Sequence, residues 1–146
     1  MAKKRIITPE ELEAAHALWT EHRVLTGRGA RQVVYNYVPN WLKVVMPTLY
    51  GTDKVEDPIV WLKLFLPGSR WTFYATEFSD VAPDGYPEMM FGYLISALGP
   101  DCDELCYLPL SSVREINESF RFQVERDLWW TPRLLSRVMD SDRPRL

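Results

Sequence analysis

The first part of the chain has a helical pattern of apolar and polar positions. Thr8 is followed by Pro9 and then by Glu11, which is the arrangement of an N-cap with a capping box. Apolar residues then recur at helical spacing up to Gly27 and place on one face Leu12, Ala15, Trp19 and His22. The pattern predicts a long amphipathic helix near the N-terminus.

A short irregular region follows this helix. Residues 32–38 alternate as in a strand or an extended arm, with Val33, Tyr35 and Tyr37 on one side. Pro39 interrupts this alternation. We expect Asn40 to cap a short helix over residues 41–46, which Pro47 ends.

From Pro58 onward the apolar period changes to two. Residues 59–66 and 71–77 predict two strands that pair antiparallel around a turn at 67–70, with a core face formed by Val60, Leu62, Leu64 and Leu66. Residues 89–97 and 104–108 predict two more strands, and Gly92 marks a bulge or a close approach of backbones. A fifth, half-buried strand is predicted where polar residues alternate with Phe120, Phe122 and Val124.

Two helix signals complete the pattern. Ser112 and Glu115 form a second capping box, and Thr131–Pro132 predicts the cap of a C-terminal helix through Leu134, Leu135 and Val138. Strands grouped between helices indicate an α+β fold rather than alternating β-α-β units. We therefore expect a single domain (1–146) with an antiparallel sheet of about five strands, an N-terminal helix, short connecting helices and a C-terminal helix. Its parts are an N-terminal helical extension (1–40), an α+β body (41–139) and a loose tail (140–146).

Composition agrees with one globular domain. The chain has 146 residues, of which 47% are hydrophobic, and no apolar run is long enough to span a membrane. The basic start at Lys3–Arg5 is followed by too few apolar residues for a secretory signal. Two cysteines make no disulfide framework, so reduced thiols and a cytoplasmic location are expected.

Charge is unevenly distributed along the chain. Residues 1–40 carry +2, residues 41–128 carry −7 and residues 129–146 carry +2. An acidic body repels phosphates and disfavours direct binding of nucleic acids. The acids either keep the surface solvated or form a face that docks on a basic partner, and the candidate docking residues are Asp80, Asp84 and Glu88.

No pattern predicts a metal, a cofactor or a catalytic centre. His16 and His22 are six residues apart, which places them about 120° apart on a helix and does not suit a shared metal. Cys102 and Cys106 are more widely spaced than zinc-ribbon pairs and lack two further soft ligands nearby.

The cluster Glu125-Arg126-Asp127 stands out at the end of the fifth predicted strand. Alternation places Arg126 on the apolar side, where an unpaired charge is costly. One interpretation is a structural ion pair with Glu77, or with Asp57 as second choice. The other is an arginine that binds an anion or a partner at the sheet end.

Aromatic residues are abundant, and some of them are candidates for stacking or for an interface. This set consists of Trp61, Trp71, Tyr74, Trp129 and Trp130. Most are expected in the core, but adjacent Trp129 and Trp130 cannot both face inward in an extended segment. The candidate binding residues among them are Trp71, Tyr74 and Trp130.

The stretch from Pro47 to Pro132 resembles the family named domain of unknown function 2958. The matching residues are Pro47, Leu49-Tyr50, Thr52, Asp57-Pro58-Ile59-Val60, Lys63, Phe65-Leu66-Pro67, Trp71–Glu77, Phe91-Gly92-Tyr93, Glu104-Leu105, Tyr107, Glu125–Leu128 and Pro132. This chain departs from the family pattern at Cys106, where a glycine is usual, and at Pro109, where a capping serine is usual. The resemblance implies a setting on plasmids, conjugative elements or phages, but no activity.

Two function classes remain. The first is a non-enzymatic accessory protein of a phage or mobile element that binds a host protein, for example to inhibit a defence system such as CRISPR or restriction. The second is a nucleic-acid-associated or hydrolytic accessory domain that uses Glu77, Glu125, Arg126 and Asp127. The identity of the partner, the oligomeric state and the role of residues 1–40 stay open at the level of sequence.

Overall fold

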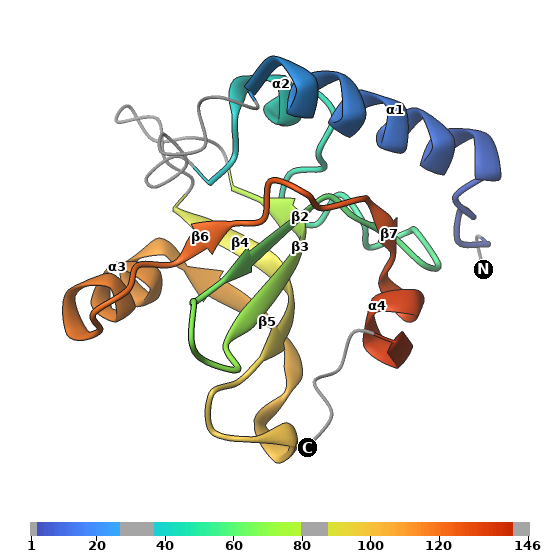
Figure 1. The fold of residues 1–146 in the computed structure, drawn as a ribbon. Helices are drawn as coiled ribbons and strands as arrows, with labels where there is room; N and C mark the ends of the chain where they lie inside the picture. Colours follow the sequence, from blue (N-terminus) through green and yellow to red (C-terminus); the bar gives the residue numbers. More distant parts are fainter. Residues whose placement is uncertain (1–2, 27–36, 80–87, 142–146) are drawn as a thin grey trace.

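The computed structural model describes residues 3–26, 37–79 and 88–141. Its helices are α1 (Pro9–Thr26), α2 (Asn40–Lys43), the 3-10 helix η2 (Pro100–Cys102), α3 (Leu110–Ser119) and α4 (Leu135–Ser141). Its strands are β1 (Ile59–Val60), β2 (Leu62–Phe65), β3 (Thr72–Phe78), β4 (Met89–Ile95), β5 (Glu104–Pro109), β6 (Glu125–Arg126) and β7 (Arg133–Leu134). The predicted α+β fold with helices near both ends is confirmed (Figure 1).

A five-stranded antiparallel sheet forms the centre of the molecule. Its strand order is β5-β4-β3-β2-β6, and β1 and β7 form a separate two-stranded sheet. The predicted hairpin is present, because β2 pairs with β3 from Leu62↔Ala75 to Phe65↔Thr72 across the turn at residues 67–70. Figure 1 shows α3 on one side of this sheet and α4 on the other.

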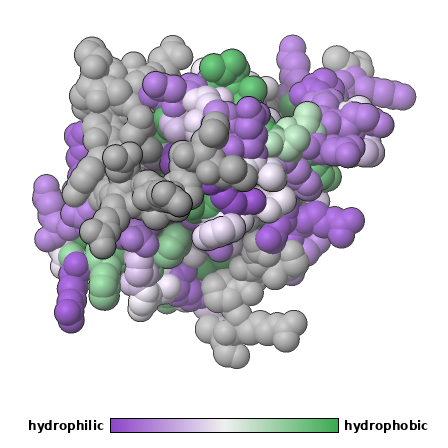
Figure 2. Space-filling view, turned by 45° about the horizontal axis from the view of Figure 1, so that its top comes forward, coloured by the Kyte–Doolittle hydropathy of each residue, from purple (hydrophilic) through white to green (hydrophobic). Residues whose placement is uncertain are grey.

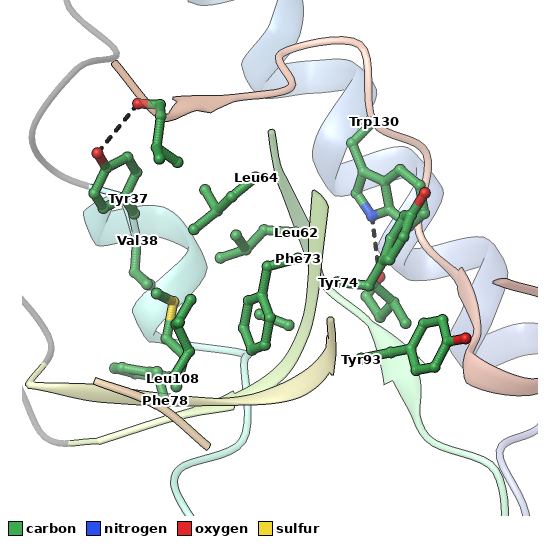
Figure 3. Close-up of a cluster of buried hydrophobic side chains, with 14 of the residues drawn as sticks. Tyr37, Val38, Leu62, Leu64, Phe73, Tyr74, Phe78, Tyr93, Leu108 and Trp130 are labelled. Carbon is green, nitrogen blue, oxygen red and sulfur yellow. Dashed lines mark hydrogen bonds between the residues drawn. The ribbon is translucent and has the colours of Figure 1, made fainter. Parts of the chain in front are cut away.

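Both faces of the sheet are buried at its centre. On one face lie the fully buried side chains of Leu62, Leu64 and Phe73, together with Tyr37 and Val38 (Figure 3). On the opposite face lie Tyr74, Tyr93 and Trp130. The predicted core positions Val60, Leu62 and Leu64 are confirmed, since each is 0% exposed. Burying such side chains contributes roughly 1.5–3 kcal/mol each to folding.

Helix α1 begins with the predicted capping box. The backbone N–H of Glu11 donates to Oγ1 of Thr8 at 3.2 Å, and the N–H of Thr8 donates to the Glu11 carboxylate at 3.4 Å. The apolar face of the helix packs on the body, where Trp19 is buried and donates to the carbonyl of Trp61 at 2.9 Å. Arg23 donates to the carbonyls of Leu128 and Trp130 at 3.0 and 2.5 Å. These bonds tie the N-terminal helix to the segment that leads into β7.

Gly92 is a position of close backbone approach, as its place inside a predicted strand indicated. A Cβ atom at this residue would lie 1.9 Å from the carbonyl oxygen of Tyr74. The ladder between β3 and β4 shifts register between Ala75 and Glu77, opposite this glycine. The bulge turns the side chain of Glu77 to a new position at the end of β3.

Two predicted strands differ from the structure. The strand over residues 59–66 is divided at Trp61, because β1 pairs with β7 while β2 pairs with β3 and β6. The fifth strand is limited to Glu125–Arg126, and Phe120 and Phe122 are 57% and 51% exposed. Alternation alone predicted this strand, but most of the segment has no neighbouring strand to pair with among the described residues.

The predicted caps of the short helices are also wrong. Helix α3 starts at Leu110 after Pro109, and Ser112 lies inside its first turn. Asn40 is the first residue of α2 rather than its cap, and this helix ends at Lys43 instead of residue 46. Helix α4 begins at Leu135, because Arg133 and Leu134 pair with β1 before it starts. Tyr37 and Val38 are buried but lie in a bend, and the rest of the predicted 32–36 arm falls outside the described residues.

Candidate functional site

The aromatic residues predicted as binding candidates are mostly core residues. Trp71, Tyr74 and Trp130 are 7%, 2% and 2% exposed. The indole of Trp130 donates to the carbonyl of Val60 at 3.0 Å and packs 5.6 Å from the ring of Tyr74 (Figure 3). Their placement leaves none of these three rings available on the surface for stacking or for an interface.

Trp129 is the exposed member of the Trp129–Trp130 pair. Its ring is 77% exposed and lies 5.5 Å from the guanidinium carbon of Arg23. Its backbone N–H donates to Oδ1 of Asp127 at 2.9 Å. The sequence correctly indicated that one ring would face outward, but the outward ring is Trp129, and Trp130, the predicted binding residue, faces the core.

Glu77 is a buried carboxylate that holds a loop. It is 2% exposed, and it accepts hydrogen bonds from the backbone N–H of Tyr50 at 2.8 Å and of Thr52 at 3.0 Å. The hydroxyl of Thr52 donates to the same carboxylate. All these donors come from the segment before β1, so Glu77 fixes the 50–52 turn against the end of β3.

The predicted ion pair of Arg126 is therefore not formed. Glu77 is engaged by the 50–52 turn, and the alternative partner Asp57 accepts from the N–H and hydroxyl of Ser136 at 2.9 and 2.5 Å. Nε and Nη1 of Arg126 are buried and have no hydrogen-bond partner in the described part of the chain. Burial lowers the pKa of Arg126 to about 10. Among residues 3–26, 37–79 and 88–141, no acid forms an ion pair with this partly desolvated guanidinium.

The other members of the Glu125-Arg126-Asp127 cluster point to the opposite face of β6. Arg126 pairs with Leu64 and shares its face, so Glu125 and Asp127 lie on the other side. Glu125 is exposed, and Asp127 lies 3.8 Å from the ammonium of Lys63. Glu77 is on β3, beyond β2 from this cluster. The structure does not bring these four residues together as one chemical site.

Of the three acidic residues predicted to dock on a partner, the structure describes one. Asp80 and Asp84 lie outside the described residues, and the side chain of Glu88 is exposed. Asp103, another acid of the central segment, is internal, because its two oxygens bind Arg70 at 2.7 and 2.6 Å. This bidentate pair joins the β2–β3 turn to the β4–β5 connection. Not every acid of the −7 segment therefore contributes to the surface.

The two histidines make ordinary structural contacts, and the two cysteines are free thiols. The His16 ring nitrogen lies 2.6 Å from the carbonyl of Pro132, and the His22 ring stacks on Trp41 at 4.3 Å. Cys102 and Cys106 are free thiols, and burial together with Glu104 raises the pKa of Cys106. Within residues 3–26, 37–79 and 88–141, no group of three or more potential ligands is placed to hold a metal ion.

Sequence reasoning missed an exposed aromatic and aliphatic surface beside β5. We call Tyr50, Phe91, Leu105 and Tyr107 the edge patch. Phe91 and Tyr107 face each other across β4 and β5 with ring centroids 4.8 Å apart, and Tyr50 lies 6.2 Å from Tyr107. Tyr50, Leu105 and Tyr107 are 64%, 45% and 45% exposed. Partial desolvation, Tyr50 and the nearby carboxylates of Glu77 and Asp53 raise the pKa of Tyr107.

The edge patch contrasts with the surface over α1 and α2. That surface is mostly hydrophilic, and its apolar residues stand in small separate groups (Figure 2). Alternation in residues 104–108 was the available signal for the patch, because it places Leu105 and Tyr107 on one side. The contribution of Tyr50 had no sequence signal, since it depends on the contact with Glu77.

Comparison with known proteins gives one match. A family model described as a protein of unknown function (DUF2958) matches residues 45–141, about two thirds of the chain. No curated protein and no solved structure matches. No helix in the described part of the chain is long and apolar enough to cross a membrane.

Proposed function

This chain belongs to the DUF2958 family, and from that premise we propose that it is a non-enzymatic accessory protein that binds another protein. The partner we propose is a host protein, in the plasmid or phage setting that the family resemblance implies. A more specific form of this proposal is that the protein inhibits a defence system such as CRISPR or restriction. This form depends only on the plasmid or phage setting.

The edge patch is the observation that carries the proposal. Two tyrosines, a phenylalanine and a leucine gather there, and three of these side chains are 45–64% exposed. Tyrosine is enriched at protein interfaces because it supplies a large apolar surface together with a polar hydroxyl. A cluster of exposed apolar side chains is typical of an interaction site, whereas single exposed apolar residues are ordinary.

The hydrolytic alternative has weaker support. It requires Glu77, Glu125, Arg126 and Asp127 to act on one substrate, but Glu77 is buried under the 50–52 turn. Arg126 lies on the opposite face of β6 from Glu125 and Asp127. A general acid or base must lie within hydrogen-bond reach of its substrate, which this arrangement does not provide for the set.

Co-purification from a host lysate, with and without nuclease, tests the proposal. The edge-patch variant replaces Tyr50, Leu105 and Tyr107 with serine. The matched control replaces Leu98 and Phe120 with serine, and these two residues are 86% and 57% exposed outside the edge patch. We expect a protein partner that survives nuclease treatment, is retained by the control and is lost from the edge-patch variant. Absence of any partner above background, or its release by nuclease, contradicts the proposal.

The acidic residues supply a second arm of the same test. Exposed charges are screened beyond about 8–10 Å at physiological ionic strength, so association with a basic partner should slow as salt is added. Reversal of Asp80, Asp84 and Glu88 to lysine should slow association further without unfolding the protein. An unchanged association rate would reduce these three acids to residues that maintain solubility.

A further inference from the structure

Strand β5 is the end strand of the five-stranded sheet. Its six residues pair with β4 from Met89↔Pro109 to Leu94↔Glu104. On its other side no strand lies among the described residues. Natural proteins usually shield such an edge by charge, proline, shortness or a covering element, because an open edge accepts a further strand.

The hydrogen-bond pattern shows which groups face outward. The N–H of Leu110 donates to the carbonyl of Glu88 at 2.9 Å, and hydrogen-bonded pairs alternate along an antiparallel ladder. Leu108, Cys106 and Glu104 therefore bond to β4. The N–H and C=O groups of Leu105 and Tyr107 point away from β4, toward the open edge. Proline at position 109 has no N–H, so the free edge has its donors at residues 105 and 107.

The side chains beside these groups differ on the two faces. Leu105 and Tyr107 lie on the face of the edge patch, whereas Glu104 and Cys106 lie on the other face. Exposed carboxylates lie near the edge, since Glu104 is the first residue of β5, Glu88 on the β4 side bonds to Leu110 just beyond its other end, and Asp53 contributes to the raised pKa of Tyr107. A strand added here would place its residues opposite Leu105 and Tyr107 on the apolar face. Its intervening residues would lie beside Glu104.

We propose that the open edge of β5 binds an extended segment of a partner protein by strand addition, and that this segment alternates apolar with basic residues. Backbone groups of residues 105 and 107 supply the affinity, and the edge patch and Glu104 supply the specificity. The inference rests on the proposed protein-binding function and names the kind of segment that is bound.

The probe is a synthetic eight-residue peptide that alternates valine with lysine, compared with a peptide that has glutamate in place of lysine. Both are added to the full-length ¹⁵N-labelled protein, and amide hydrogen exchange is followed by NMR. We expect the lysine peptide to slow exchange at Leu105 and Tyr107 at least tenfold, and the glutamate peptide to have no effect. Binding of the lysine peptide should weaken as salt is raised.

Two variants connect the effect to the edge. Leu105→Pro removes an outward N–H and leaves the bonds to β4 in place, and Leu105→Lys adds a repelling charge with the backbone unchanged. Each should weaken peptide binding at least tenfold, while Leu98→Lys on the exposed Leu98 should bind like the wild type. Leu105→Lys keeps the test valid if the proline variant is unfolded.

Three results of the peptide experiment would overturn the inference. They are no binding of the lysine peptide, protection that appears away from β5, and a dimer by light scattering whose residues 105 and 107 are already protected without peptide. The last result would assign the edge to a second copy of the chain. A host partner that still binds the Leu105 variants would overturn the strand-addition inference and leave the proposed function standing, whereas the absence of any partner would remove the proposed function itself.

Discussion

Replacing Arg126 with methionine should stabilise this protein. The guanidinium has two buried nitrogens without a partner in the described part of the chain, and burial lowers its pKa to about 10. Each tenfold weakening of proton binding corresponds to about 1.4 kcal/mol, so the charged group costs the folded state about 3 kcal/mol. Methionine keeps the apolar stem against the core without the charge. We expect the free energy of unfolding to rise by about 1–3 kcal/mol, which for this chain length raises Tm by roughly 3–9 °C.

The pH dependence of this gain follows from the direction of the pKa change. The folded state holds the Arg126 proton less tightly than the unfolded state, so stability rises with pH only between the folded pKa, about 10, and the higher unfolded value. Below about pH 10 the cost is fully present. The advantage of Arg126→Met should therefore be constant between pH 6 and pH 9.

Urea denaturation followed by tryptophan fluorescence measures the difference. Arg121→Met is the matched control, because Arg121 is exposed on the same segment and should change stability by less than about 0.5 kcal/mol. Arg126→Lys retains the charge and should show no gain. A methionine variant less stable than the wild type would refute the reasoning and would mean that the guanidinium makes interactions that stabilise the fold. If Arg126 binds a partner's carboxylate, the same variant should gain stability and lose binding.

Three other substitutions test the fold. Leu62→Asp places a charge at a fully buried position and should abolish the cooperative transition in circular dichroism, whereas Leu98→Asp at an exposed position should fold. Glu77→Gln removes an acceptor from the bonds to Tyr50 and Thr52, and should lower the free energy of unfolding by about 1–3 kcal/mol in the same urea assay. Gly92→Ala should lower Tm, because it forces a methyl group to within 1.9 Å of the Tyr74 carbonyl oxygen. A variant with the wild-type Tm would show that β3 and β4 do not approach so closely.

The sequence was most informative where alternation coincided with burial. The β2–β3 hairpin was predicted correctly because Leu62 and Leu64 alternate with partly exposed residues and a turn signal separates the strands. The same alternation misled at Phe120 and Phe122, which are exposed. Periodicity records which side chains share a face, but it does not record whether another strand lies beside that face.

The candidate site was less predictable for the same reason. An edge strand is defined by strand order, and the order β5-β4-β3-β2-β6 depends on contacts between distant segments. The cost of burying Arg126 was anticipated, but the choice of Glu77 as its partner failed. The bulge opposite Gly92 reorients Glu77 toward the 50–52 turn, and a register shift of this kind has no local sequence signature beyond the glycine itself.

Glu77 links the residues of the family resemblance to the surface that carries the proposed function. Its carboxylate accepts from the N–H of Tyr50, which adopts a positive φ of 70° that a non-glycine residue reaches only at some cost in free energy. The resulting turn holds the exposed ring of Tyr50 beside Tyr107. The buried Glu77 therefore positions Tyr50, one of the two exposed tyrosines of the edge patch. Loss of partner binding in Glu77→Gln should match that of Tyr50→Ala, because Glu77 holds the loop that carries Tyr50.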